Sequence, residues 1–109
     1  MKKLYTIVLF TMTTLSVTSQ VIITEIADPN NDSQARFIEL ANIGDNAFDL
    51  TGYQLVRWTN ANTAYTTSSA VDLSEFGSLQ SKGILTLANN TNFETVYSVA
   101  PTKVIGSGG

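Results

Sequence analysis

Short runs of apolar and β-branched residues, separated by turn residues, follow one another along the chain from residue 21 onward. In one of these runs Ile38 and Leu40 alternate with Phe37 and Glu39, which places the two pairs on opposite faces of an extended strand. Such a pattern is typical of strands in a sheet. The runs predict strands at 21–27, 36–42, 53–58 and 83–88, a short alternating segment at 48–50, and a polar, exposed or edge strand at 63–69.

The spacing becomes helical near the C-terminal end. Phe93, Val96 and Tyr97 stand at i, i+3 and i+4, directly after a run of asparagine and threonine that supplies helix caps. One short helix is therefore expected over 93–97, and a last apolar pair at 104–105 could begin another strand. Many short strands, closely spaced turns and one short helix predict an all-β antiparallel sandwich.

The first 19 residues have a different character. Lys2 and Lys3 precede a short apolar run at 4–10, and a threonine-rich stretch then ends at Ser19, a residue small enough for a signal-peptidase site. A transmembrane anchor is the alternative, but the apolar run is short for a bilayer about 30 Å thick. We therefore expect a signal peptide at 1–19, a domain at 20–109 and no transmembrane anchor. The protein is expected to be exported, and to be extracellular, at the cell surface or periplasmic.

Composition removes several classes of chemistry. The 109 residues include no Cys and no His, which excludes disulfides, Cys- or His-ligated zinc and a Ser-His-Asp triad. The chain has 6 Lys+Arg and 9 Asp+Glu, and without Lys2 and Lys3 the balance is 4 − 9 = −5. Because negative charge repels phosphate backbones, no nucleic-acid partner is expected. No cofactor is expected either.

Three motifs stand in order along the chain: Ile-Thr-Glu-Ile at 23–26, Phe-Ile-Glu-Leu-Ala-Asn at 37–42, and Phe-Asp-Leu-Thr-Gly-Tyr-Gln-Leu at 48–55. Their order is similar to that of the lamin-tail domain family, and the resemblance runs from about residue 21 to residue 104. The motif residues that carry it are Glu25, Phe37, Ile38, Glu39, Leu40, Asn42, Asp49, Leu50, Gly52 and Tyr53.

The resemblance implies an immunoglobulin-like β-sandwich and a bacterial secreted type of domain. Such domains resemble accessory modules of exported proteins, often joined to nucleases, phosphatases or sorting domains. The family pattern usually continues with further strands beyond a glycine-rich turn, so we expect 20–109 to be a C-terminally truncated domain that lacks its last strands.

Two carboxylates of these motifs suggest catalysis. Glu25 and Glu39 could act as an acid and base pair. The alternative is structural: both belong to the family pattern, and a carboxylate can accept hydrogen bonds that hold a loop. We favour the structural role for both, and we interpret Asn42 as an asparagine that stabilises a turn.

The loop after the first predicted strand is rich in oxygen ligands. Asp28, Asn30, Asn31 and Asp32 offer the hard oxygens that Ca²⁺ prefers, but the glycine and distal glutamate of an EF-hand are missing. A solvated turn explains the same residues, and we favour it, so no metal is expected.

Exposed aromatic side chains are the remaining candidates. Trp58 and Tyr65, with Tyr53 nearby in sequence, could form a platform for a sugar ring, whereas in a small sandwich such residues usually pack in the core or on a sheet face. We expect a non-catalytic exported module for adhesion, docking or spacing in a larger extracellular protein, with an unknown protein or glycan as partner. The alternatives are a carbohydrate-binding module, or an accessory domain of a secreted nuclease or phosphatase.

Overall fold

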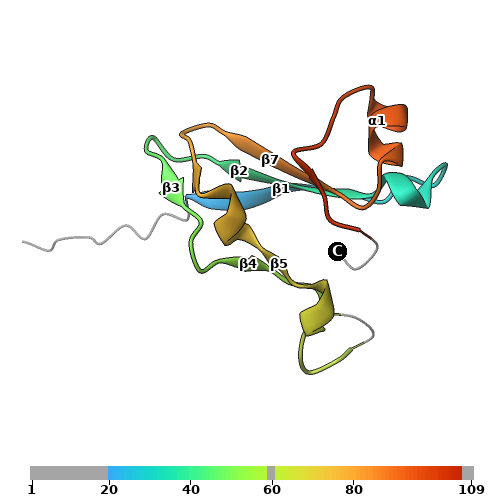
Figure 1. The fold of residues 1–109 in the computed structure, drawn as a ribbon, viewed down its shortest axis with the longest axis horizontal. Helices are drawn as coiled ribbons and strands as arrows, with labels where there is room; N and C mark the ends of the chain where they lie inside the picture. The colour runs from blue at the N-terminus through green and yellow to red at the C-terminus, as the bar shows by residue number, and fades with distance from the viewer. Residues whose placement is uncertain (1–19, 59–60, 107–109) are drawn as a thin grey trace, which may run out of the picture.

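The computed structural model describes residues 20–58 and 61–106, and the expected signal peptide lies outside them. A four-stranded sheet in the order β1-β2-β7-β8 forms one layer of the fold (Figure 1). Its strands are β1 (Val21–Ala27), β2 (Phe37–Asn42), β7 (Ile84–Ala88) and β8 (Lys103–Val104).

Two short antiparallel ribbons form the second layer. In Figure 1, β4 and β5 lie below β1, β2 and β7, and β3 lies beside the left end of β1. One ribbon pairs β3 (Phe48–Asp49) with β6 (Ser78–Leu79), and the other pairs β4 (Gln54–Leu55) with β5 (Val71–Asp72). The 3-10 helix η3 (Leu73–Phe76) connects β5 to β6.

The main core lies between these layers. Leu40, Leu85 and Leu87 from the four-stranded sheet pack with Leu50 and Leu73 from the second layer, and none of the five is more than 6% exposed. Burying a leucine side chain is worth about 1.5–3 kcal/mol, so this cluster is the principal source of stability. The predicted all-β, immunoglobulin-like sandwich is confirmed.

A second apolar cluster covers the opposite face of the four-stranded sheet at one end. Phe37 and Ala88 are buried there against Phe93 of α1 (Asn92–Tyr97), which confirms the predicted helix. The Phe37 ring meets the rings of Phe93 and Tyr97 edge to face, with centroids 5.1 and 5.2 Å apart. The 3-10 helix η1 (Ser33–Ala35) contacts α1 at the same end.

The antiparallel register of β1 on β2 contains a β-bulge. Ile23 pairs with Leu40 and Ile26 pairs with Ile38, so Thr24 has no partner in the ladder. Cross-strand partners lie on the same face of a sheet. Because of the bulge, Ile23 and Ile26 therefore both face the main core, although they are three residues apart.

Two predicted strands differ from the structure. The prediction of a strand at 63–69 is wrong: this segment contains only the 3-10 helix η2 (Thr67–Ser69). Ser69 donates its backbone N–H and its hydroxyl to the carbonyl of Thr66, over 3.0 and 2.8 Å, and this local turn replaces a ladder. The strand predicted over 53–58 pairs only at Gln54–Leu55, because its partner β5 has only two residues.

The chain returns in parallel at the C-terminal edge of the sheet. β8 begins one residue before the predicted pair 104–105 and runs parallel to β7, whereas the sequence pattern predicts antiparallel pairing. The reason is the intervening α1, which provides a crossover that a tight turn cannot make.

Candidate functional site

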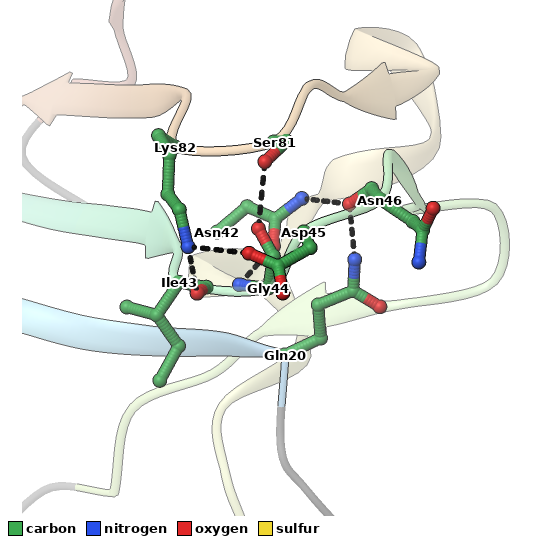
Figure 2. A network of polar contacts seen from close by, with 8 residues as sticks. All are labelled: Gln20, Asn42, Ile43, Gly44, Asp45, Asn46, Ser81 and Lys82. Atoms are coloured by element: carbon green, nitrogen blue, oxygen red, sulfur yellow. Dashed lines mark hydrogen bonds and ion pairs between the residues drawn. The ribbon is translucent and has the colours of Figure 1, made fainter.

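The end of β2 forms a corner around a buried asparagine. The side chain of Asn42 is 1% exposed, and its Nδ2 donates to the carbonyls of Asn46 and Leu79 over 2.8 and 2.9 Å. Its Oδ1 accepts the backbone N–H of Gly44 over 2.9 Å (Figure 2). The amide of Asn42 thus ties β2 to the following turn and to β6 in the other layer.

Residues around Asn42 close the same corner (Figure 2). Lys82 Nζ donates to the carbonyl of Ile43 over 2.7 Å and to Asp45 Oδ1 over 3.1 Å. Ser81 Oγ donates to the carbonyl of Gly44 over 2.7 Å, and Gln20 Nε2 donates to the carbonyl of Asn46. These polar groups are engaged with one another, which makes the corner a structural clamp.

Glu25 and Glu39 lie directly opposite each other on β1 and β2. Glu39 Oε1 accepts the hydroxyl of Thr24 over 2.6 Å. The register places both carboxylates on the face of the sheet that points away from the main core, and neither of them lines the two cavities described below. The structure therefore brings the hypothetical acid and base together on an exposed face, outside both of these cavities.

The third motif builds a bend between β3 and β4. Asp49 Oδ1 accepts the backbone N–H of Thr51 over 2.9 Å, and hydrogen bonds from the Thr51 side chain and backbone lower the pKa of Asp49. Leu50 is buried in the main core, and Gly52 takes a φ of 81° that favours glycine. Tyr53 is 53% exposed. The residues of the third motif therefore lie in the bend or directly next to it.

The loop of candidate Ca²⁺ ligands is held by contacts within the protein. Asp28 pairs with Arg36 over 2.6 Å. Asp32 caps η1 by accepting the N–H of Gln34, and its other oxygen accepts from Asn92 over 3.0 Å. These hydrogen bonds, that of Asn92 first, lower the pKa of Asp32. Within 20–58 and 61–106, no group of three or more His, Cys, Asp or Glu is placed to hold a metal ion.

The two candidate aromatic residues meet in the segment between β4 and η2. The rings of Trp58 and Tyr65 lie edge to face, with centroids 5.5 Å apart. Trp58 is 54% exposed and Tyr65 is 37% exposed, so the pair is a surface feature and not part of the core. The segment that carries them extends away from the four-stranded sheet (Figure 1).

Two cavities open between the layers beside β1, and the sequence pattern does not predict them. One encloses about 380 Å³ and is lined by Ile26, Ile38 and Ile105 with Arg57 at its side. The other encloses about 420 Å³ and has Ile23 in its wall. Their signal in the sequence is two of the three isoleucines in β1, Ile23 and Ile26, but only the bulge shows that both face inward.

The part of the chain that the structure describes contains no helix long and apolar enough to cross a membrane. No curated protein and no solved structure matches the chain at a significant level. The family model of the lamin tail domain matches residues 14–107, across all the strands and the helix described above. The chain therefore belongs to the lamin tail domain family.

Proposed function

We propose that this chain is a non-catalytic exported module that docks onto a protein at the cell surface and positions a larger extracellular protein there. The observation that carries the proposal is the uncovered inner face of β1: Ile23 is 50% exposed and Ile26 is 70% exposed, although both face the core. Apolar surface left open on a folded domain is typical of interaction sites.

The use of the polar motif residues supports a passive role. Asn42 clamps two layers, Asp49 holds a bend, and Glu39 accepts a hydroxyl from the neighbouring strand. General acid or base catalysis needs a carboxylate within reach of a bound substrate. A panel of phosphoester and glycoside substrates tests this directly: we expect no turnover, and turnover that is abolished by Glu39→Gln would contradict the proposal.

Export is part of the proposal and rests on the basic and apolar pattern of the first 19 residues. The test is to express the full chain in a bacterium and determine the N-terminal residue of the product outside the cytoplasm. We expect Gln20 as the new N-terminus. Retention of Met1 in the cytoplasmic fraction would contradict export.

Docking is tested by adding the fluorescently labelled chain to intact cells. We expect saturable binding that is lost when the cells are first treated with a protease. Binding that survives protease but is lost after periodate oxidation of glycans would instead favour the carbohydrate candidate below. The absence of saturable binding to untreated cells would overturn the docking proposal.

Carbohydrate binding is a second candidate, favoured by the exposed contact between Trp58 and Tyr65. An exposed indole offers an apolar face on which a sugar ring can stack. A glycan array with the wild type and Trp58→Ala tests it, with Ile43→Ala as a matched control, since Ile43 is 50% exposed. Binding that Trp58→Ala alone removes supports this candidate, and no binding by the wild type rules it out.

A catalytic domain elsewhere in the same polypeptide is compatible with either candidate function. If the full polypeptide carries a nuclease or phosphatase domain, this module would serve to hold that enzyme near its substrate. The open reading frame beyond the codon for Gly109 tests this possibility.

A further inference from the structure

β1 is an edge strand of the four-stranded sheet. It pairs with β2, and no second strand pairs with it within 20–58 and 61–106. At seven residues it is the longest strand described in the structure. A long unpaired edge presents backbone N–H and C=O groups that can hydrogen-bond to another extended chain. The backbone of β1 is therefore a template for one more strand.

The inner side of this edge is apolar. Ile23 and Ile26 face the main core but remain half exposed or more, and each lines one of the two cavities between the layers. A strand added beside β1 would alternate its side chains between the two faces of the sheet. Apolar residues at every second position would cover the two isoleucines and the cavity mouths.

The outer side of the edge is negative. Glu25 is exposed and its carboxylate has no hydrogen bond or ion pair in the described part of the chain, while Glu39 lies directly opposite it. Of the four basic residues in 20–58 and 61–106, Arg36, Lys82 and Lys103 are paired with Asp28, Asp45 and Glu75. The fourth, Arg57, lines the cavity beside Ile26 on the inner side of the edge. An outward-facing lysine or arginine on the added strand would complement Glu25.

We propose that β1 binds an extended segment of another protein by strand addition, and that this segment alternates apolar residues with polar ones and carries a basic residue beside Glu25. The inference rests on the proposed docking function and names the kind of partner it takes. A second copy of this chain fits less well, because pairing two β1 strands brings together two negative edges, each from a domain with a balance of 4 − 9 = −5.

The test uses the full chain and two synthetic peptides with blocked ends. Both are nonapeptides of alternating valine and threonine. In one a lysine replaces the central threonine, and in the other a glutamate does. Fluorescence anisotropy measures the dissociation constant of each. We expect the lysine peptide to bind about 1.4- to fivefold more tightly at low salt, since a cross-strand ion pair contributes about 0.2–1 kcal/mol.

Matched variants locate the site. Glu25→Lys should invert the preference between the two peptides, whereas Glu94→Lys should leave it unchanged, because Glu94 is an exposed residue of α1. Ile26→Thr should weaken both peptides by about tenfold through lost apolar contact. Ile84→Thr should have no such effect, because Ile84 is 57% exposed on the outer face of the same sheet.

Several outcomes would overturn the inference: equal binding of the two peptides, equal effects of Ile26→Thr and Ile84→Thr, or dimerisation of the chain that Ile26→Thr abolishes. The result is separable from the proposed function. Protease-sensitive binding to cells together with no peptide binding rejects strand addition alone. Peptide binding without cell binding rejects the docking function and leaves the strand-addition site intact.

Discussion

The side-chain amide of Asn42 lies 2.9 Å from the carbonyl oxygen of Leu79, which is 37 residues further along the chain. Asn42 ends β2 and Leu79 ends β6, so this hydrogen bond joins the two layers of the sandwich at one corner. Buried polar groups cost free energy when they are left unpaired. The corner is therefore sensitive to small changes at residue 42.

Replacing Asn42 should destabilise the protein strongly. Asn42→Ala removes the side-chain partner of the Leu79 carbonyl and of the Gly44 N–H, and it leaves the Asn46 carbonyl with the hydrogen bond from Gln20. An unpaired polar group costs about 1–3 kcal/mol when it is buried, and these groups are partly buried, so we expect a loss of about 2–3 kcal/mol in the free energy of unfolding. Urea denaturation measures it. Asn42→Asp keeps the acceptor but not the donors, and a wild-type stability for that variant would contradict the role of the two carbonyl contacts.

Gly52→Ala tests backbone strain without a steric clash. The φ of Gly52 is 81°, and a Cβ there would meet no heavy atom within 4 Å. The cost should therefore come from the left-handed conformation alone, about 1–2 kcal/mol. Gly52→Asn should recover part of it, because asparagine tolerates this region better than alanine. Equal midpoints for the alanine and asparagine variants in urea would contradict this account.

Leu50→Ala should be among the most damaging core changes. Leu50 is 1% exposed and packs with leucines from both layers, so its truncation leaves a cavity as well as removing apolar contacts. We expect a loss of about 2–5 kcal/mol, measured by chemical denaturation. Leu50→Met, which conserves volume, should cost less than about 1.5 kcal/mol. If both variants lost the same amount, packing at this site would not explain the stability.

The protein should lose stability at acidic pH through its capping carboxylates. Hydrogen bonds from the side chain and backbone of Ser74 lower the pKa of Asp72 below its ordinary value of 3.8, and the pKa values of Asp32 and Asp49 are lowered in the same way by their own partners. A carboxyl whose pKa is lower in the folded state stabilises fully above its unfolded pKa. That contribution disappears as the pH falls through the folded value.

We therefore expect the urea midpoint to decrease as the pH is lowered from about 5 to about 2, and to decrease less in a variant with asparagine at 32, 49 and 72. Asparagine can still accept the capping hydrogen bond and does not titrate. A variant with Glu94→Gln serves as the control, because Glu94 is exposed and caps no turn through its side chain. An unchanged slope with pH in the triple variant would reject these three groups as the source.

Much of the sheet can be predicted from the alternation of apolar residues. The predicted strands 36–42 and 83–88 agree with β2 and β7, except that each begins one residue early. They are predictable because both faces of each strand carry apolar side chains that are buried in the fold. The helix around Phe93 is also predictable, since its apolar spacing matches the ring contacts that it makes with Phe37. These elements depend on local pattern and burial together.

Other features depend on which part of the chain a segment forms hydrogen bonds with. The run 53–58 looks like a full strand, but its neighbour β5 offers only two residues for pairing. The threonines and serines of 63–69 favour extended backbone, yet local hydrogen bonds to Thr66 give a 3-10 turn instead. The cavities beside β1 were not predictable, because they depend on how far the second layer extends over the first.

The unpaired Thr24 has a consequence for insertions and deletions. Every residue of β1 after it is shifted by one position relative to a regular strand. Deleting Thr24 would leave Ile23 opposite Leu40 and Glu25 opposite Glu39, so the residues on both sides would keep their faces in a regular strand. Deleting a paired residue of β1 would instead exchange the faces of the residues on one side of the deletion. The bulge is therefore the position at which β1 tolerates the loss of one residue best.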